Sequence, residues 1–132
     1  MSLCSQNGFW RTGIAMYGIS DLLRLEETTH RFESGYNQSL LGILPRSKKI
    51  WQERSPINLV SKINTPLLLF HGTEDRAVPF EQSSLLYEKM LRQKKNCQLF
   101  SMQGEGHGFR DPKSKKFVLA TVTKALKVIE NS

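Results

Sequence analysis

The sequence predicts an α/β fold with about three parallel strands flanked by helices, and three observations lead to this prediction. A run of apolar residues, 66–70, follows Thr65 and is apolar on both faces, which is typical of a strand buried inside a parallel sheet. A second candidate strand, 98–102, comes one helical segment later, at the spacing of a strand-helix-strand unit. Both strands end in polar or glycine-rich loops, the edge of an open α/β sheet where ligands and chemistry collect.

The first element of the predicted sheet is a strand over 12–17, which ends at Gly18. Ser20 follows it in a G-x-S segment, but Leu22 stands where a nucleophile elbow needs its second glycine. We therefore interpret Ser20 as the N-cap of the next helix, with Asp21 favouring the positive end of its dipole.

Short helices are predicted between the first strand and the central one. A helix that begins near Leu22 is expected to be broken at 35–37, and a second helix, 48–53, to be closed by Ser55-Pro56. The aromatic residues of this region either line a pocket for an apolar side chain or belong to the core, which is the more frequent place for them: Phe32, Tyr36 and Trp51.

Two longer helices complete the predicted fold. The pattern over 81–93 has an apolar stripe at helical spacing and basic residues at its end, and 114–130 repeats this arrangement. The members of the two stripes are Leu85, Leu86, Tyr87, Met90 and Leu91, and then Val118, Val122, Ala125, Leu126 and Ile129. Without a linker, repeat or low-complexity segment, residues 1–132 are expected to form a single domain.

Composition narrows the function classes. The net charge is +7, but the basic residues are dispersed and lack interleaved aromatics, so we expect no nucleic-acid partner. No run approaches the ~18 apolar residues of a membrane span, so no membrane association is expected. Cys4 and Cys97 have no metal-binding spacing and suit a reducing cytoplasm, the predicted location, although a disulfide between them stays open.

Two loops carry the candidate chemistry. Asp75 lies three residues beyond Gly72 at the end of the central strand, placed either to act on a ligand or to close an Asx-type turn. His107 lies in a loop with three glycines after the next strand, where small neighbours allow close approach to a partner. The two residues are 32 positions apart, so both loops should leave the same edge of the sheet side by side. An aspartate that orients a histidine is two thirds of a nucleophilic triad.

The sequences of these two loops resemble those of a known protein family. The segments HGTEDRAVP (71–79) and EGHGF (105–109), supported by 12–22, 54–57 and 78–83, resemble the C-terminal part of an α/β-hydrolase. More narrowly, they resemble the prolyl oligopeptidase family of serine peptidases, and the likeness extends over roughly 9–129. The resemblance implies that Asp75 is the acid and His107 the base of a Ser-Asp-His triad. It implies a peptide or small ester substrate, with no cofactor and no metal.

The sequence departs from the family pattern in one respect. It contains no G-x-S-x-G, and in this family the nucleophile comes before the acid and the base. We therefore expect a partial catalytic domain that is inactive by itself. Its strand 12–17 would be an open apolar edge, available to a second copy or to a separate N-terminal half. Two alternatives stay open: a fragment of a carboxylesterase or dienelactone hydrolase-like enzyme, and a non-catalytic self-associating module.

Overall fold

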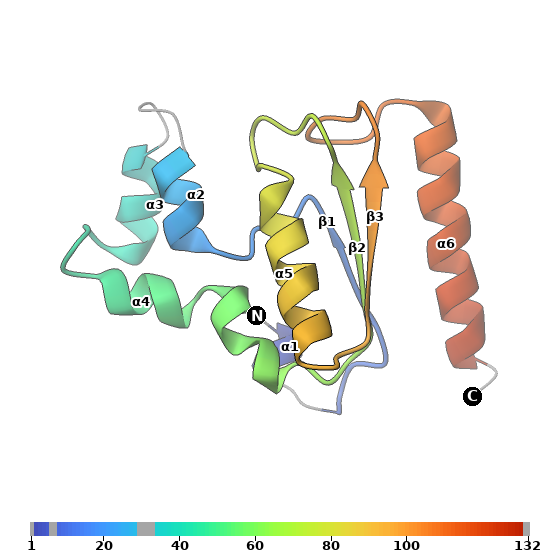
Figure 1. The fold of residues 1–132 in the computed structure, drawn as a ribbon, viewed down its shortest axis with the longest axis horizontal. Helices are drawn as coiled ribbons and strands as arrows, with labels where there is room; N and C mark the ends of the chain where they lie inside the picture. Colours follow the sequence, from blue (N-terminus) through green and yellow to red (C-terminus); the bar gives the residue numbers. More distant parts are fainter. Residues whose placement is uncertain (1, 6–7, 29–33, 131–132) are drawn as a thin grey trace.

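The computed structural model of the chain describes residues 2–5, 8–28 and 34–130. Within them, three strands form one parallel sheet: β1 (Gly13–Met16), β2 (Leu67–Gly72) and β3 (Cys97–Met102), in the order β1-β2-β3. The predicted α/β fold with three parallel strands flanked by helices is confirmed (Figure 1).

The helices lie before, between and after the strands (Figure 1). They are α1 (Ser2–Ser5), α2 (Leu22–Thr28), α3 (Ser34–Leu41), α4 (Lys48–Glu53), the 3-10 helix η1 (Pro56–Lys62), α5 (Glu81–Arg92) and α6 (Pro112–Glu130). The strands and the two long helices match the predicted positions to within two residues, and β2 shows one of the largest differences, because it was expected to stop at Phe70. It continues through His71 and Gly72, both buried, because the His71 ring finds hydrogen-bonding partners inside the fold.

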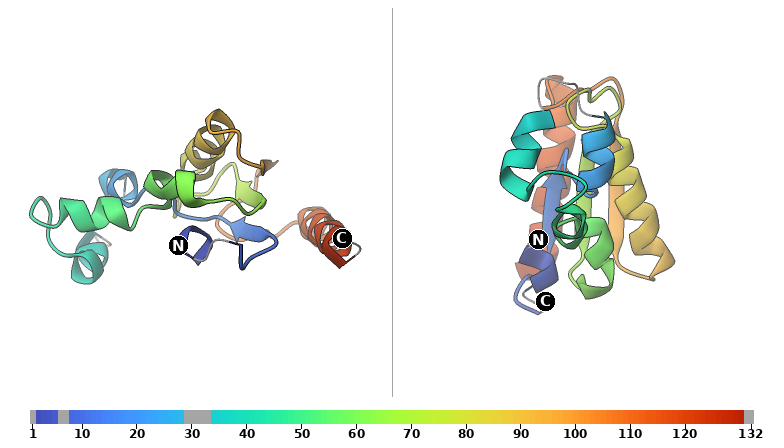
Figure 2. Two further views of the ribbon diagram at one scale, coloured as in Figure 1. Left: turned by 90° about the horizontal axis from the view of Figure 1, so that it is seen from below. Right: turned by 90° about the vertical axis from the view of Figure 1, so that its left-hand side faces the viewer.

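Strand β2 is central because it is apolar on both faces. All six of its residues are buried, whereas the edge strands β1 and β3 contain buried, half-buried and exposed positions. Leu67 and Leu69 face α5 and η1, and Leu68 and Phe70 face α6. The sheet is thus covered by helices on both faces, which Figure 2 shows from two further directions.

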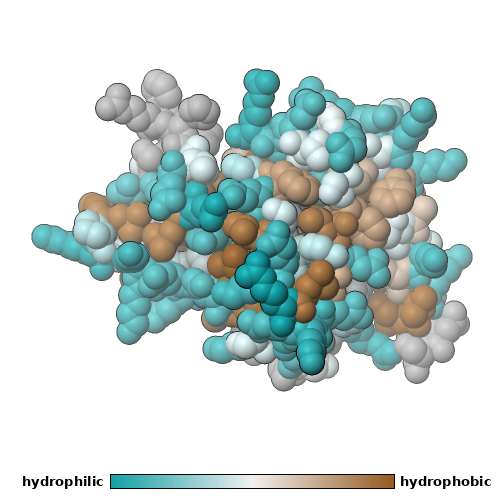
Figure 3. Space-filling model, in the orientation of Figure 1, coloured by the Kyte–Doolittle hydropathy of each residue, from teal (hydrophilic) through white to brown (hydrophobic). Residues whose placement is uncertain are grey.

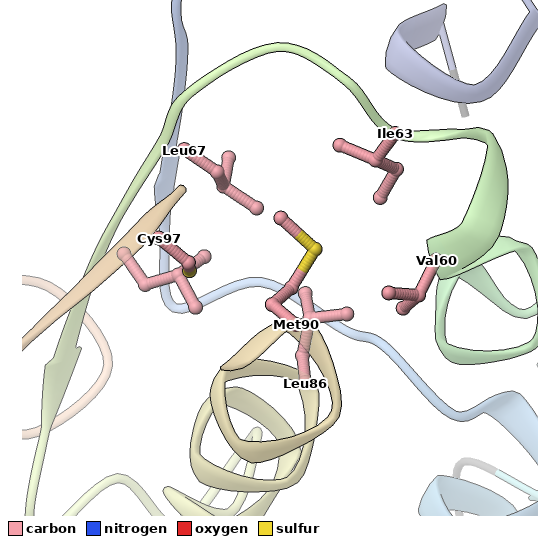
Figure 4. Close-up of a cluster of buried hydrophobic side chains, with 7 residues drawn as sticks. Val60, Ile63, Leu67, Leu86, Met90 and Cys97 are labelled. Atoms are coloured by element: carbon pink, nitrogen blue, oxygen red, sulfur yellow. The ribbon is translucent and has the colours of Figure 1, made fainter. Parts of the chain in front are cut away.

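The larger core cluster surrounds Met90 of α5, which is completely buried (Figure 4). Its sulfur-containing side chain lies among apolar side chains of η1, of the residue that follows η1, and of the starts of β2 and β3: Val60, Ile63, Leu67 and Cys97. This packing fixes α5 and β2 relative to each other, and with them the loop that joins the two.

The register of the sheet brings two strand ends level. Gly72 pairs with Met102, so β2 and β3 end together and their following loops leave the same edge, at the top of Figure 1. β1 ends opposite Phe70, two residues earlier, and its next residue, Tyr17, donates its N–H to Phe70 O at 2.8 Å.

The region between β1 and β2 corrects two predictions. The expected break at 35–37 is wrong, because these residues lie in the first turn of α3, where Gly35 interrupts no established ladder of hydrogen bonds. The Ser20 cap is also wrong: Asp21 Oδ1 accepts the N–H groups of Leu23 and Arg24 at 3.1 and 3.2 Å and so caps α2.

The aromatic residues of this region that the structure describes lie in different environments. Trp51 is fully buried and donates its indole N–H to Gly42 O at 3.0 Å, so it belongs to the core. Tyr36 is 68% exposed, and Phe32 lies outside the described residues.

The surface is mostly polar, with apolar patches at both ends of the view in Figure 3. One patch covers α3 and the turn after it, where Tyr36, Leu40 and Ile43 are exposed, and another follows α6, with Leu119, Leu126 and Val128. Leu126, predicted to face the core, is 47% exposed. None of the helices in the described ranges combines the length and apolarity that crossing a bilayer requires.

Candidate functional site

The loops that follow β2 and β3 are tied together at the carboxyl edge of the sheet. The Thr73 N–H donates to Met102 O at 3.0 Å and the Glu74 N–H to Glu105 O at 2.9 Å, while the Gly104 N–H donates to the Thr73 hydroxyl oxygen at 3.0 Å. The starts of the two loops therefore lie side by side (Figure 1).

Gly72 makes this close approach possible. A Cβ at this position would lie much closer than van der Waals contact to two backbone oxygens, Glu105 O and Gly106 O. Backbone atoms cannot give way as easily as the end of a flexible side chain. The glycine therefore lets the loop that carries His107 come directly against the end of β2.

The two carboxylate oxygens of Asp75 have different partners. Its side chain is fully buried. Oδ1 accepts the N–H groups of Ala77 and Val78 at 3.0 and 2.8 Å, which closes an Asx-type turn. Oδ2 lies 2.9 Å from Nδ1 of His107. One oxygen thus closes the turn that the sequence allowed for, and the other contacts His107.

His107 meets the carboxylate with its inner nitrogen. Nδ1–H donates to Asp75 Oδ2, and 47% of the side chain is exposed, so Nε2 is the nitrogen that can exchange a proton with a third group. The Tyr17 ring packs against the imidazole with a centroid distance of 5.0 Å, and its backbone φ of 45° is unusual for a non-glycine residue. The expectation that Asp75 and His107 lie within hydrogen-bonding reach is confirmed.

Glu105 closes the loop that holds His107. It is 6% exposed, and its carboxylate accepts the N–H groups of Arg110 and Asp111 at 2.8 and 3.0 Å. The bond from Arg110, together with one from the Ser114 side chain, lowers the pKa of the Glu105 carboxyl. In the sequence, Glu105 stood out only as a member of the segment 105–109. A carboxylate seven residues before the start of a helix was the signal for this role.

His71, also quoted only within a motif, is a second histidine beside Asp75. It is completely buried, and its Nε2 lies 3.4 Å from Asp75 Oδ2 and 2.9 Å from Val78 O. Its Nδ1 lies 2.7 Å from the Ser83 hydroxyl oxygen. The signal was present in the sequence, since a histidine at the end of an all-apolar strand must have polar partners inside the fold.

Ser20 is not placed to act as a nucleophile. It is 1% exposed, and its hydroxyl donates to Gln82 O at 2.6 Å while its N–H donates to Gln82 Oε1 at 3.0 Å. Gln82 also accepts the Asp21 N–H at 2.8 Å and so locks the loop after β1 to the start of α5.

An open cleft of about 830 Å³ lies beside His107 and gives other molecules access to its ring. Both loops line this cleft, with Glu74, Arg76, Gly106, Arg110 and Asp111 among the lining residues. Over the described ranges, histidine, cysteine and acidic side chains do not gather in any group of three or more that could hold a metal ion.

The family of the chain follows from a comparison with known proteins. A model of the prolyl oligopeptidase family matches residues 1–127. The chain belongs to the prolyl oligopeptidase family. This family consists of serine peptidases, and the two segments that suggested the resemblance, 71–79 and 105–109, lie inside the match.

Relatives within and around the prolyl oligopeptidase family share part of their length with this chain. The structure of a Mycobacterium tuberculosis puromycin-hydrolysing peptidase is 33% identical, with a TM-score of 0.79, and the match covers 84% of this chain and 17% of that one. The uncharacterized peptidase YtmA of Bacillus subtilis is 27% identical over 110 residues, 83% of this chain and 42% of YtmA. Esterase LipC of Mycobacterium tuberculosis is 32% identical over 68 residues, 50% of this chain and 17% of LipC. The chain thus spans less than half the length of these proteins.

Proposed function

We propose that this chain supplies the acid and the base of a Ser-Asp-His triad in a peptidase of the prolyl oligopeptidase family, with Asp75 as acid and His107 as base. The observation that carries the proposal is the 2.9 Å contact between His107 Nδ1 and the buried Asp75 Oδ2, at the carboxyl edge of the sheet. Family membership supports it, because this family consists of serine peptidases.

The geometry suits each proposed role. Asp75 Oδ2 holds the ring in the tautomer that carries its proton on Nδ1, so Nε2 is free to take the proton of an attacking serine. The same nitrogen then protonates the leaving amine, while the carboxylate stabilises the imidazolium that forms in between. Because Asp75 is already fixed by two backbone N–H groups, little reorganisation is needed when that charge develops.

The serine of this triad would come from a segment other than these residues. The 132 residues contain no G-x-S-x-G, and Ser20 is buried and hydrogen-bonded away from His107. We therefore expect no turnover from this polypeptide alone, because His107 would have no serine to activate as a nucleophile.

The test joins this chain to the part of the Mycobacterium tuberculosis peptidase that it does not resemble, in place of the matched segment. The joined protein should hydrolyse an aminoacyl p-nitroanilide. His107→Ala and Asp75→Asn should each lower kcat on the order of 10⁴-fold. The control is Arg92→Ala, an exposed residue at the far end of α5, which should leave kcat unchanged. Equal activity with and without His107 would refute the base assignment, provided that circular dichroism shows all four proteins folded.

An esterase is the second candidate, and the local similarity to LipC favours it. The same joined protein separates the two functions if a short-chain p-nitrophenyl ester is assayed beside the nitroanilide. Puromycin is a third substrate for this assay, because the solved relative is described as hydrolysing it. A peptidase should turn over the amide substrates, whereas an esterase should act on the ester alone.

A further inference from the structure

The buried carboxylate of Asp75 lies between two histidines, of which only one reaches the surface. His107 contacts Oδ2 at 2.9 Å with a half-exposed ring, and His71 approaches the same oxygen at 3.4 Å from a ring with no exposed surface. The proposed triad accounts for the first histidine and leaves the second without a role.

The partners of His71 fix the position of its proton. A backbone carbonyl only accepts hydrogen bonds, so Nε2, 2.9 Å from Val78 O, must carry the hydrogen. The neutral ring then has a bare Nδ1, which accepts the Ser83 hydroxyl proton at 2.7 Å. The hydrogen bond of Nε2–H goes to Val78 O, and the same nitrogen lies 3.4 Å from Asp75 Oδ2, so the positive end of the N–H dipole is close to the carboxylate.

The two rings therefore hold opposite tautomers around one oxygen. His107 donates from Nδ1, and His71 donates from Nε2. Through Val78, His71 also fixes the turn whose N–H binds Asp75 Oδ1 at 2.8 Å. Both oxygens of Asp75 thus depend on the orientation of His71, and that orientation depends on Ser83.

We propose that His71 is a positioning residue for the Asp75–His107 pair, and that Val78 O and Ser83 together set its tautomer. This inference rests on the proposed function and deepens it: His71 contacts no substrate, but it keeps Asp75 Oδ2 aimed at His107. Its loss leaves the buried Val78 O without this donor and removes the N–H dipole that lies 3.4 Å from the carboxylate, which loosens the turn around Asp75 and with it the contact to His107.

The experiment reads the tautomers directly in the 132-residue chain, by nitrogen NMR of ¹⁵N-labelled imidazoles correlated with their carbon-bound ring protons. The chain has three histidines, so a His30→Gln background leaves only the two rings of interest. At pH 9, where an ordinary imidazole is neutral, His107 should show a protonated Nδ1 and His71 a protonated Nε2.

The variants form matched pairs. Ser83→Ala removes the buried hydroxyl that His71 needs, and Ser55→Ala removes an equally buried hydroxyl that binds Trp51 O and the Leu22 N–H away from the site. His71→Phe keeps a ring but no nitrogen, and His71→Gln retains an N–H donor near the Nε2 position.

Ser83→Ala and His71→Phe should shift the His107 nitrogens towards a mixture of tautomers, whereas His71→Gln and Ser55→Ala should leave them as in the parent. A His107 spectrum that stays unchanged in Ser83→Ala, with the protein folded, would overturn the positioning role, as would an equal shift in Ser55→Ala. If His71→Phe does not fold, the two serine variants decide the question. A parent protein in which His107 Nδ1 is bare would instead refute the triad proposal, so the two failures are distinguishable.

Discussion

Backbone groups hold the acidic side chains of the site in place. Asp75 binds two N–H groups of its own turn with one oxygen, and Glu105 binds the N–H groups of Arg110 and Asp111 with both. Such bonds are stronger than neutral ones because the acceptor is charged. The position of His107 therefore depends on the ionisation of Glu105, two residues before it.

Replacing Glu105 with glutamine should destabilise the protein at pH 7 and much less at pH 3. The native pKa of Glu105 is lowered, so its stabilising effect is fully present above the ordinary value of about 4.3 and is lost as the pH falls below it, towards the native pKa. Protonated Glu105 and glutamine are then alike. Urea unfolding at pH 7, 5, 4 and 3 measures the difference between parent and variant. The control is Glu88→Gln, an exposed partner of Arg92 on α5, which should change little at any pH. A difference for Glu105→Gln that stays constant over this range would contradict the prediction.

The two thiols should react at very different rates in the folded protein. Burial raises the pKa of the Cys97 thiol to about 11, so at pH 8 only about one molecule in a thousand carries the reactive thiolate. Cys4 is half-buried and free, and it serves as the internal reference. With a chromogenic disulfide reagent at pH 8, one thiol should react quickly and the second only after urea is added. Two equally fast thiols in the native protein would show that Cys97 is not shielded.

At the scale of an element, α5 connects the core to the site. It begins at Glu81, just after the Asp75 turn, and near its other end Met90 packs in the main apolar cluster (Figure 4). Gln82 and Ser83 in its first turn bind the loop after β1 and His71. The helix therefore transmits the packing of the core to the position of the site.

Met90→Ala should lower the free energy of unfolding by about 2–5 kcal/mol, because a fully buried methionine leaves a cavity when truncated. The neighbouring residue on the same helix provides the control: Leu91 is 47% exposed, so Leu91→Ala should cost about 0.5 kcal/mol or less. Denaturant unfolding of the three proteins measures both values. Similar costs for the two variants would mean that α5 does not pack on the sheet as described.

The elements with a strong pattern were predictable from the sequence. The all-apolar run 66–70 and the helical stripe of 81–93 are governed by burial, which leaves a periodic record along the chain. The break at 35–37 was wrong, because a glycine in the first turn of a helix costs less than one in its middle. The Ser20 cap was wrong because Gln82, 62 residues away, binds its hydroxyl. A contact between residues so far apart along the chain leaves no local pattern in the sequence.

The same distinction applies to the candidate site. Asp75 and His107 could be paired because strand order alone puts both loops on one edge of the sheet. His71 and Glu105 were not recognised, because their roles depend on which atoms face them after folding. The contacts of both residues are part of the fold, and the positioning role of His71 is a proposal.

At the scale of the whole molecule, β1 is an edge strand of the sheet that residues 2–5, 8–28 and 34–130 form, and it has no strand partner among them on its outer side. The N–H groups of Gly13 and Tyr17 donate to Pro66 O and Phe70 O in the direction of β2, so the alternating N–H groups of Ile14 and Met16 face away from the sheet. The side chains of Ile14 and Met16 are also 37% and 38% exposed. An apolar edge of this kind is a template for pairing with another strand.

We predict that the isolated chain self-associates through β1 at micromolar concentration. Sedimentation should show a dimer, and hydrogen exchange should slow at the amides of Ile14 and Met16 as the concentration rises. Ile14→Lys should raise the dissociation constant at least about tenfold, because a charge on an edge strand opposes pairing. The matched control is Leu40→Lys, which adds the same charge to the exposed apolar patch on α3. A stable monomer whose Ile14 and Met16 amides exchange freely would rule out this interface, and a dimer broken only by Leu40→Lys would move it to α3.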